Sequence, residues 1–192
     1  MENEIFIWTD GASRGNPGPG GCGVVIVSPE KEVVELGGRE EHTTNNRMEL
    51  TGAISAIFFV SKNISVNTQI IIHTDSSYVI NGITKWVHNW RKNNWLSSQK
   101  EEVLNRDLWE KLFSLAAGKK IEWKYVAGHS GTPGNERCDE IATSYADGNN
   151  PSLYRGALSN YSVPLFDLSN VSFANKKTKS RSKAKAYSYL SM

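Results

Sequence analysis

The stretch Ile5–Gly21, IFIWTDGASRGNPGPGG, decides the fold predicted for this chain. It opens with four apolar residues, two of them β-branched, a pattern typical of a short strand with at least one buried face. The strand is expected to end at Asp10, where a loop rich in glycine and proline begins. A buried carboxylate is costly unless a partner or a metal compensates its charge. Asp10 is therefore predicted to be a ligand for a cation.

Length and charge predict one globular domain followed by an extension. The chain has 192 residues, of which 39% are hydrophobic, enough for a substantial core. Six of its 22 Lys and Arg residues lie in 170–192, which hold no acidic residue, so the remainder carries 16 basic against 20 acidic residues. We predict a folded domain over 1–148 and a C-terminal extension over 149–192 that carries the basic run and is partly disordered.

The cysteines and the N-terminus predict a cytoplasmic protein. Cys22 and Cys138 have neither the number nor the spacing of a disulfide framework or a metal site, and both are expected to be buried in a reducing compartment. The N-terminus lacks the pattern of a signal peptide, and no apolar run reaches membrane-spanning length. We expect a monomer without membrane contact.

Strands and a helix follow the opening stretch. Gly23–Val27 and Val33–Leu36 predict two further strands of an antiparallel meander. Several candidate N-caps in 43–46 precede a helix, in which Glu49 adjoins the apolar face. The apolar positions of that helix are Leu50, Ala53, Ile54, Ile57 and Phe58. These residues predict that one side of the helix packs on the sheet.

A second apolar strand also ends in a carboxylate. Gln69–Thr74 is β-branched and nearly all apolar, which predicts a central strand covered on both faces, and Asp75 follows it. Because a helix separates this strand from the first, a right-handed crossover would make the two strands parallel. Asp10 and Asp75 are then expected at the same edge of the sheet, where open α/β sheets bind ligands.

The remaining elements place one histidine and one more carboxylate. The predicted elements are helical sequence over 76–94, a helix over 107–117, a strand over 121–126 and a last helix that starts at 132–133. His129 lies in the glycine-flanked loop before the last helix, and Asp139 lies on that helix beside its apolar side. Both residues are therefore candidates for the same site.

The carboxylates that these patterns single out are Asp10, Glu49, Asp75 and Asp139. Converging acidic side chains repel one another and raise each other's pKa unless a cation is present. Oxygen ligands in that number suit Mg²⁺ or Mn²⁺ and do not suit zinc. Two such ions can stabilise both the attacking and the leaving oxygen of a phosphodiester.

Five segments, in order and spacing, resemble the successive motifs of bacterial-type ribonuclease HI. They are TDGASRGNPGPGG, TTNNRMELTGA, TDSSYVINGITKWVHNW, DLWEKL and AGHSGTPGNERCDEIA, and the resemblance covers residues 3–147. It implies the ribonuclease H fold, an α/β architecture with a mixed five-stranded sheet flanked by helices. It also implies cleavage of the RNA strand of RNA–DNA hybrids with two Mg²⁺ ions, or Mn²⁺ as a substitute, leaving 5′-phosphate and 3′-hydroxyl ends.

The resemblance also assigns roles to the acidic residues and the histidine. Asp10 matches the ligand that bridges both ions, and Asp139 matches a ligand of the ion that activates water. Glu49 and Asp75 match ligands of the ion at the leaving oxygen. His129 matches a loop histidine that helps proton transfer or product departure, a role that suits a pKa near neutrality.

Residues that match nucleic-acid contacts fall into two groups. The positions that match contacts to the hybrid near the cut are Asn16, Asn45 and Asn46, and those that match DNA-strand contacts are Thr44, Arg47, Trp86, Trp90 and Asn105. Amides can both donate and accept hydrogen bonds, as recognition of a 2′-hydroxyl requires. From the residues alone, Asn45 or Asn46 could also cap the helix, and Trp86 and Trp90 could be packing residues.

Three features depart from the pattern of the family. Ser77 stands where a longer amide is frequent, Ala127 where a lysine is frequent, and Glu101 and Glu102 lie in a loop that is often basic. These differences should weaken substrate binding. The basic run over 176–185 is a hypothetical source of compensating electrostatic affinity, and a solubilising tail is the alternative.

Two other functions compete with hybrid cleavage. A nuclease of the same fold could act on double-stranded RNA or on DNA, but TTNNRMEL looks suited to hybrid recognition. A catalytically idle hybrid-binding module would be favoured by loss of one acidic residue, and all four are present.

Overall fold

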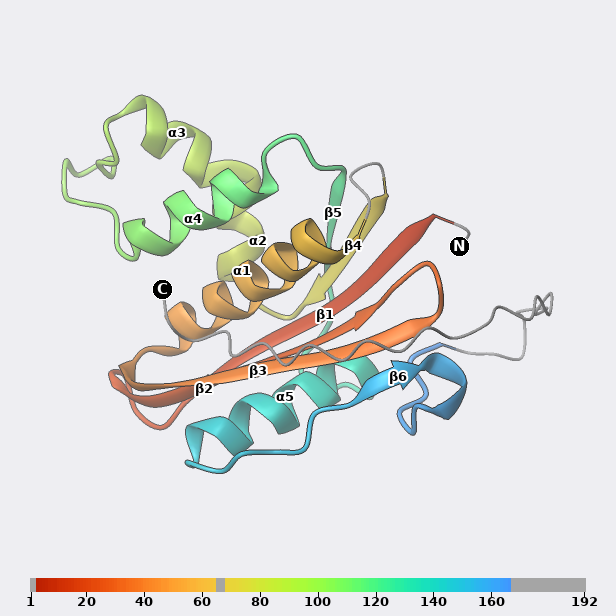
Figure 1. Ribbon diagram of the computed structural model, residues 1–192. Coiled ribbons are helices and arrows are strands. Elements are labelled where there is room, and N and C mark those ends of the chain that lie inside the picture. Colours follow the sequence, from red (N-terminus) through yellow and green to blue (C-terminus); the bar gives the residue numbers. More distant parts are fainter. Residues whose placement is uncertain (1–2, 65–67, 167–192) are drawn as a thin grey trace.

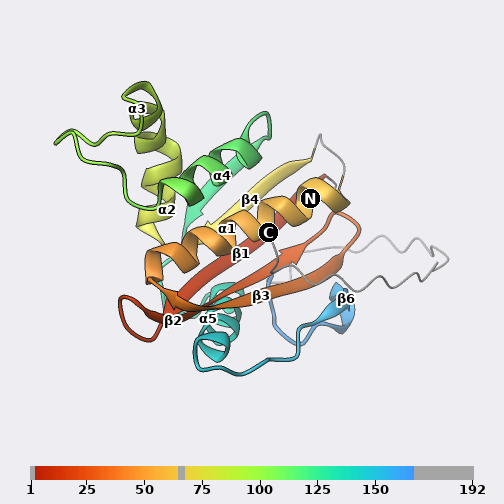
Figure 2. The same ribbon diagram turned by 60° about the vertical axis from the view of Figure 1, so that its left-hand side comes forward.

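A mixed sheet with helices on both faces forms the centre of the molecule (Figures 1 and 2). The computed structural model describes residues 3–64 and 68–166. In this part of the chain the strands are β1 (Glu4–Ser13), β2 (Gly18–Val27), β3 (Glu32–Thr43), β4 (Gln69–Thr74), β5 (Ile121–Tyr125) and β6 (Arg155–Ala157). Their order is β5-β4-β1-β2-β3-β6. β1 is antiparallel to β2 and parallel to β4, so the predicted meander and crossover are confirmed.

Two helices cover the central strands from opposite sides. α1 (Asn45–Asn63) packs on one face of β1 and β2, and α5 (Pro133–Ala146) packs on the other face (Figure 1). The other helical segments are α2 (Ser77–Asn81), the π-helical turn η1 (Gly82–Trp86), α3 (Val87–Lys92), α4 (Arg106–Ala116) and the 3₁₀ turn η2 (Leu158–Asn160). No helix of the described residues is long and apolar enough to cross a membrane.

The number of strands differs from the prediction. The described residues contain six strands in place of the five expected, because β6 pairs with Glu32–Val34 at the edge of β3. β6 has only three residues, Arg-Gly-Ala, which carry neither alternation nor β-branched side chains. A strand of that kind leaves no periodic signal in a sequence.

The glycine-rich stretch after Asp10 is largely strand, so its prediction as a loop was wrong. β1 continues to Ser13 and β2 begins at Gly18, which places Asp10 inside β1 and not at its end. The glycines allow the helices to approach the strands. A Cβ added at Gly11 would lie 2.3 Å from the backbone nitrogen of Glu49, and one added at Gly23 would lie 2.1 Å from the carbonyl oxygen of Cys138.

Two helix features also differ from expectation. The N-cap of α1 is Thr44, whose Oγ1 accepts a hydrogen bond from the Arg47 amide, so neither Asn45 nor Asn46 caps the helix. The helical sequence over 76–94 is divided by η1, where a Cβ on Gly82 would lie 1.9 Å from the Trp109 ring. Packing of that ring explains why a glycine occupies the middle of this segment.

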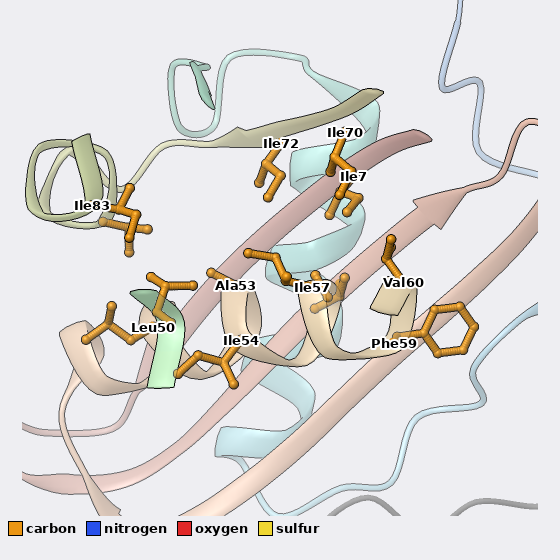
Figure 3. Close-up of a cluster of buried hydrophobic side chains, with 14 of the residues drawn as sticks. Ile7, Leu50, Ala53, Ile54, Ile57, Phe59, Val60, Ile70, Ile72 and Ile83 are labelled. Carbon is orange, nitrogen blue, oxygen red and sulfur yellow. The ribbon is translucent and has the colours of Figure 1, made fainter. Parts of the chain in front are cut away.

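The larger core lies between α1 and the sheet. Figure 3 shows side chains of α1, Leu50, Ala53 and Ile57, beside Ile7 of β1 and Ile72 of β4. All five are fully buried. This packing confirms the predicted apolar face at Leu50, Ala53, Ile54 and Ile57, but Phe59 is buried in this core in place of the predicted Phe58, which is only partly buried. It fixes α1, which also carries Glu49, on the sheet.

A smaller core on the α5 face includes residues beyond 148. Trp8, Val25, Val27, Val33 and Cys138 form its buried centre, and Tyr154, Leu158, Tyr161, Leu165 and Phe166 pack against it. The Phe166 ring centroid lies 5.0 Å from that of Phe6 and 5.7 Å from that of Trp8. The first part of the predicted extension is therefore packed on the sheet, whereas 167–192 lie outside the described residues.

A buried carboxylate joins this segment to α5. The side chain of Glu35, on β3, is 0% exposed and pairs with Arg137 at 2.7 Å. It also accepts hydrogen bonds from the Tyr161 hydroxyl at 2.6 Å and the Tyr154 amide at 2.8 Å. Burial opposes ionisation of Glu35, but these donors outweigh it and hold its pKa below the usual value.

We predict that Glu35→Ala lowers the free energy of unfolding by about 3–5 kcal/mol, because it leaves the Arg137 charge without its buried partner. Glu140→Ala is the control, since Glu140 also pairs with Arg137 at 3.0 Å but its side chain is 66% exposed. This control should change stability by less than about 1 kcal/mol. Equal losses in urea denaturation of the two variants would contradict the role given to Glu35.

Candidate metal centre and nucleic-acid interface

Three of the predicted carboxylates meet at one point between the sheet and α1. Asp10 comes from β1, Glu49 from α1, and Asp75 directly follows β4. Each contributes an oxygen that lies within 4.8 Å of the others. Asp10 is 6% exposed and Glu49 is 5% exposed. The prediction that these residues converge is confirmed.

The electrostatics of this cluster favour a cation. Burial first and the charge of Asp75 second raise the pKa of Asp10 to about 7, although the Gly11 amide, which donates to Oδ1 at 2.7 Å, opposes the rise. Burial, followed by the charges of Asp10 and Asp75, raises the pKa of Glu49 well above its usual value. The Oε2 atom of Glu49 is buried without a hydrogen-bond partner. An oxygen-ligated divalent ion such as Mg²⁺ fits this donor set, because it would supply the missing positive charge.

Asp139 and His129 lie at the margin of the cluster. Asp139, on α5, is not among the three carboxylates whose oxygens lie within 4.8 Å of one another, although its charge contributes to the raised pKa of Asp10. His129 is 82% exposed at its side chain, and its Nδ1 lies 4.0 Å from Oδ2 of Asp139. The structure therefore places both residues beside the carboxylates, with the histidine open to solvent.

The start of α1 connects the carboxylates to several predicted nucleic-acid contacts. Asn45 Nδ2 donates to Glu49 Oε1 at 3.4 Å. Arg47 pairs with Asp107 at 2.7 Å and donates to Asn105 Oδ1 at 3.4 Å, which brings the predicted phosphate-binding positions together across α1 and the start of α4. Asn46 is exposed on α1, and Asn16 is exposed in the turn between β1 and β2.

The two tryptophans predicted to meet the DNA strand differ in exposure. Their ring centroids lie 5.7 Å apart. Trp90 also packs against Trp109 at 5.7 Å, whereas Trp86 is 37% exposed. Trp90 therefore serves packing, as the alternative interpretation proposed, and Trp86 presents a surface that a ligand could contact.

Sequence reasoning missed two residues that hold Asp75. Asn135, in the first turn of α5, donates from Nδ2 to Oδ2 of Asp75 at 3.2 Å. Gly128 lies against the same oxygen, since a Cβ added there would be 2.5 Å from Oδ2. Asn135 lies 60 positions from Asp75, so no local spacing pattern could have indicated the contact.

Comparison with known proteins decides the family. The family model described as RNase H matches residues 2–147. The chain belongs to the ribonuclease H family. It is 48% identical over 154 residues to the Ribonuclease H of Cyanothece sp., covering 80% of this chain and 96% of that protein. It is 45% identical to the Ribonuclease H of Paracoccus denitrificans, covering 73% of this chain and 90% of that protein.

Solved ribonuclease H structures agree with the fold. LC9-RNase H1, described as a type 1 RNase H with the type 2 active-site motif, superposes with a TM-score of 0.71 at 27% identity, covering 83% of this chain and 80% of that chain. LC11-RNase H1 in complex with RNA/DNA hybrid has the same fold, with a TM-score of 0.57 at 22% identity, covering 75% of this chain and 97% of that chain. The ribonuclease H match ends before β6, so the sixth strand lies outside it.

The raised pKa of Asp10 predicts a pH dependence of stability in the metal-free protein. The folded state keeps a proton on Asp10 up to about pH 7, whereas the unfolded chain loses it near the ordinary value of 3.8. Folding stability should therefore fall as the pH rises between these values and level off above them, by up to about 4 kcal/mol at 1.36 kcal/mol per pKa unit.

Thermal denaturation of the wild type and of Asp10→Asn in EDTA, from pH 4.5 to 8, measures this effect. The stability difference between the two proteins should grow in favour of the variant as the pH rises. Saturating Mg²⁺ should restore the wild type at neutral pH. Parallel pH profiles for the two proteins would refute the raised pKa.

Proposed function

We propose that this ribonuclease H hydrolyses the RNA strand of RNA–DNA hybrids with divalent metal ions, Mg²⁺ in the cell, leaving 5′-phosphate and 3′-hydroxyl ends. The convergence of Asp10, Glu49 and Asp75, with oxygens within 4.8 Å, is the observation that carries the proposal. Mn²⁺ would substitute for Mg²⁺, since both ions accept oxygen ligands. We place the protein in the cytoplasm as a monomer.

In this proposal the four acidic residues divide the two ions among them. Asp10 belongs to the cluster with Glu49 and Asp75, and the charge of Asp139 also acts on it, so we propose that it would serve both ions. Glu49 and Asp75 would hold one ion, and Asp139 the other. Bound ions would polarise the scissile phosphate and lower the pKa of a water molecule.

His129 is suited to move protons at the edge of this centre. Its side chain is exposed, its backbone has a left-handed φ of 49°, and Nδ1 lies 4.0 Å from Asp139. Imidazole is the side-chain group that most readily exchanges protons with water near neutral pH. We propose that it takes up a proton near Asp139 and assists departure of the product.

Recognition of the hybrid is assigned to the surfaces beside the carboxylates. Asn16, Asn45 and Asn46 would read the RNA strand, where amides match the donor and acceptor character of 2′-hydroxyls. The DNA strand would meet Thr44, Arg47 and Asn105 at its phosphates and Trp86 at a sugar or base, with Trp90 packed against the Trp86 ring. Asn45 also contacts Glu49, which links substrate reading to the metal centre.

Cleavage of a strand-labelled hybrid tests the proposal. The wild type with Mg²⁺ should cut the RNA strand and spare the DNA strand and double-stranded RNA. Asp10→Asn should reduce the rate at least about 10³-fold, since several kcal/mol of transition-state stabilisation by the metal would be lost. Asp147→Asn is the control, because Asp147 is an exposed acid paired with Arg14 and should leave the rate unchanged. Hybrid binding without cleavage by the wild type would favour the idle binding module.

We also propose that the basic run over 176–185 adds electrostatic affinity for the hybrid. Ten positions separate it from Phe166, whose ring lies 5.7 Å from that of Trp8, two residues before Asp10. Ten residues reach at most about 36 Å, so the run can contact a duplex bound at the carboxylates. The remaining chain carries an acidic excess, to which Glu101 and Glu102 contribute, and this excess repels the phosphates of a hybrid. A basic run would offset that repulsion.

The salt dependence of hybrid binding tests the role of the run. Replacing its five lysines and Arg181 by glutamine should weaken binding at low salt and flatten the slope of log affinity against log salt, by about 0.7–0.9 for each phosphate that the run no longer neutralises. A control in which the five lysines become arginine keeps the charge and should keep the slope. An unchanged slope in the glutamine variant would remove this role and leave the cleavage proposal untouched.

A further inference from the structure

Asn135 is a buried polar residue in contact with the carboxylate cluster. It lies in the first turn of α5, is 2% exposed, and donates from Nδ2 to Oδ2 of Asp75 at 3.2 Å. The acceptor fixes the orientation of the amide. The reverse orientation would point Oδ1 of Asn135 at an oxygen of Asp75, and two acceptors repel each other.

This orientation leaves the other end of the amide without a partner. The buried side-chain atoms of the described residues that lack a hydrogen bond are Thr9 Oγ1, Glu49 Oε2 and Asn135 Oδ1. Glu49 belongs to the cluster, Thr9 precedes Asp10, and Asn135 contacts Asp75. Buried polar groups without partners are rare in folded proteins and point to a missing ion or water. Thr9 Oγ1 lies against Gly52 of α1, but the other two atoms belong to the carboxylate cluster or to a residue in contact with it. These two atoms identify the surroundings of the carboxylates as a site built for something besides stability.

Two residues from outside β4, Asn135 and Gly128, contact the Asp75 carboxylate. Asn135, on α5, donates a hydrogen bond to Oδ2 of Asp75. Gly128 lies so close to the same atom that a Cβ added at Gly128 would be 2.5 Å away from it. Gly128 belongs to the loop that carries His129. Asp75 itself lies one residue beyond the end of β4. The rotation of this carboxylate therefore depends on contacts from outside its own strand.

We propose that Asn135 is a positioning residue that fixes the rotation of the Asp75 carboxylate relative to Asp10 and Glu49, and thereby sets the affinity of the cluster for a divalent cation. The inference rests on the proposed metal-dependent function. An amide suits this task because its N–H group donates to the carboxylate without adding a charge that would compete for the ion. Residues that orient metal ligands in this way change metal affinity typically by 10–100-fold when they are replaced.

Calorimetric titration of the full chain with Mn²⁺ tests the proposal directly. Asn135→Leu keeps the approximate volume of the side chain but removes both the donor to Asp75 and the unpartnered acceptor. It should weaken Mn²⁺ binding by about 10–100-fold and leave the melting temperature of the metal-free protein unchanged or higher. The Mg²⁺ concentration for half-maximal hybrid cleavage should rise by a similar factor, and the rate at saturating Mg²⁺ should approach that of the wild type.

Asn63→Leu is the matched control, because it makes the same substitution at the end of α1 distant from Glu49. It removes the hydrogen bond from Asn63 Nδ2 to the Phe59 carbonyl oxygen, at 2.7 Å, without contact to the carboxylate cluster. It should leave Mn²⁺ affinity unchanged. Asn135→Ser provides a smaller polar replacement that cannot reach Asp75, and its Mn²⁺ affinity should fall as that of Asn135→Leu does.

The possible outcomes separate this proposal from the proposed function. Wild-type Mn²⁺ affinity in a folded Asn135→Leu or Asn135→Ser protein would overturn the positioning role. Loss of the fold in both variants would also overturn it, because Asn135 would then be structural. If the wild type itself bound no divalent ion, the metal-dependent function would fail first.

Discussion

The close approach of two helices to the central strands is the constraint on which the site depends. Gly11 lies against the backbone of α1 and Gly23 against that of α5, at separations that leave no room for a Cβ. This proximity brings Glu49 of α1 to Asp10 of β1 from one face of the sheet and Asp139 of α5 from the other face. A larger side chain at either glycine would separate a helix from the sheet, and with it a carboxylate from the cluster.

The same proximity makes the carboxylates repel one another in the metal-free protein. The carboxylates are buried close together, which raises the pKa of Asp10 to about 7, first through burial and then through the charge of Asp75. Donors nearby are few, and the buried Oε2 of Glu49 has none. Glu35 shows the contrast, because three donors hold its pKa low although its side chain is fully enclosed. The fold thus satisfies the buried Glu35 carboxylate with hydrogen bonds, whereas it leaves Glu49 Oε2 of the cluster without one.

The sequence predicted the parts of this arrangement that have local or repeated signals. Apolar strands before Asp10 and Asp75, and the apolar face beside Glu49, sufficed to predict a parallel pair of strands and a shared carboxylate site. Predictions failed where tertiary packing decides the conformation. The glycines after Asp10 lie in strands that pack closely against helices, and β6 forms by pairing with the edge of β3. The contact between Asn135 and Asp75 was not predicted, because 60 positions separate the two residues in the sequence.

The segment beyond the ribonuclease H match bears on the fourth carboxylate. Tyr154 and Tyr161 contact Glu35, which pairs with Arg137, and Arg137 lies two positions before Asp139 on α5. α5 thus contacts the sheet at the glycines and, at Arg137, through an ion pair with the fully buried Glu35 side chain. Because Tyr154 and Tyr161 both donate hydrogen bonds to the buried carboxylate of this pair, its strength depends on the extension remaining packed. Through these contacts the extension helps to position Asp139 relative to Asp10.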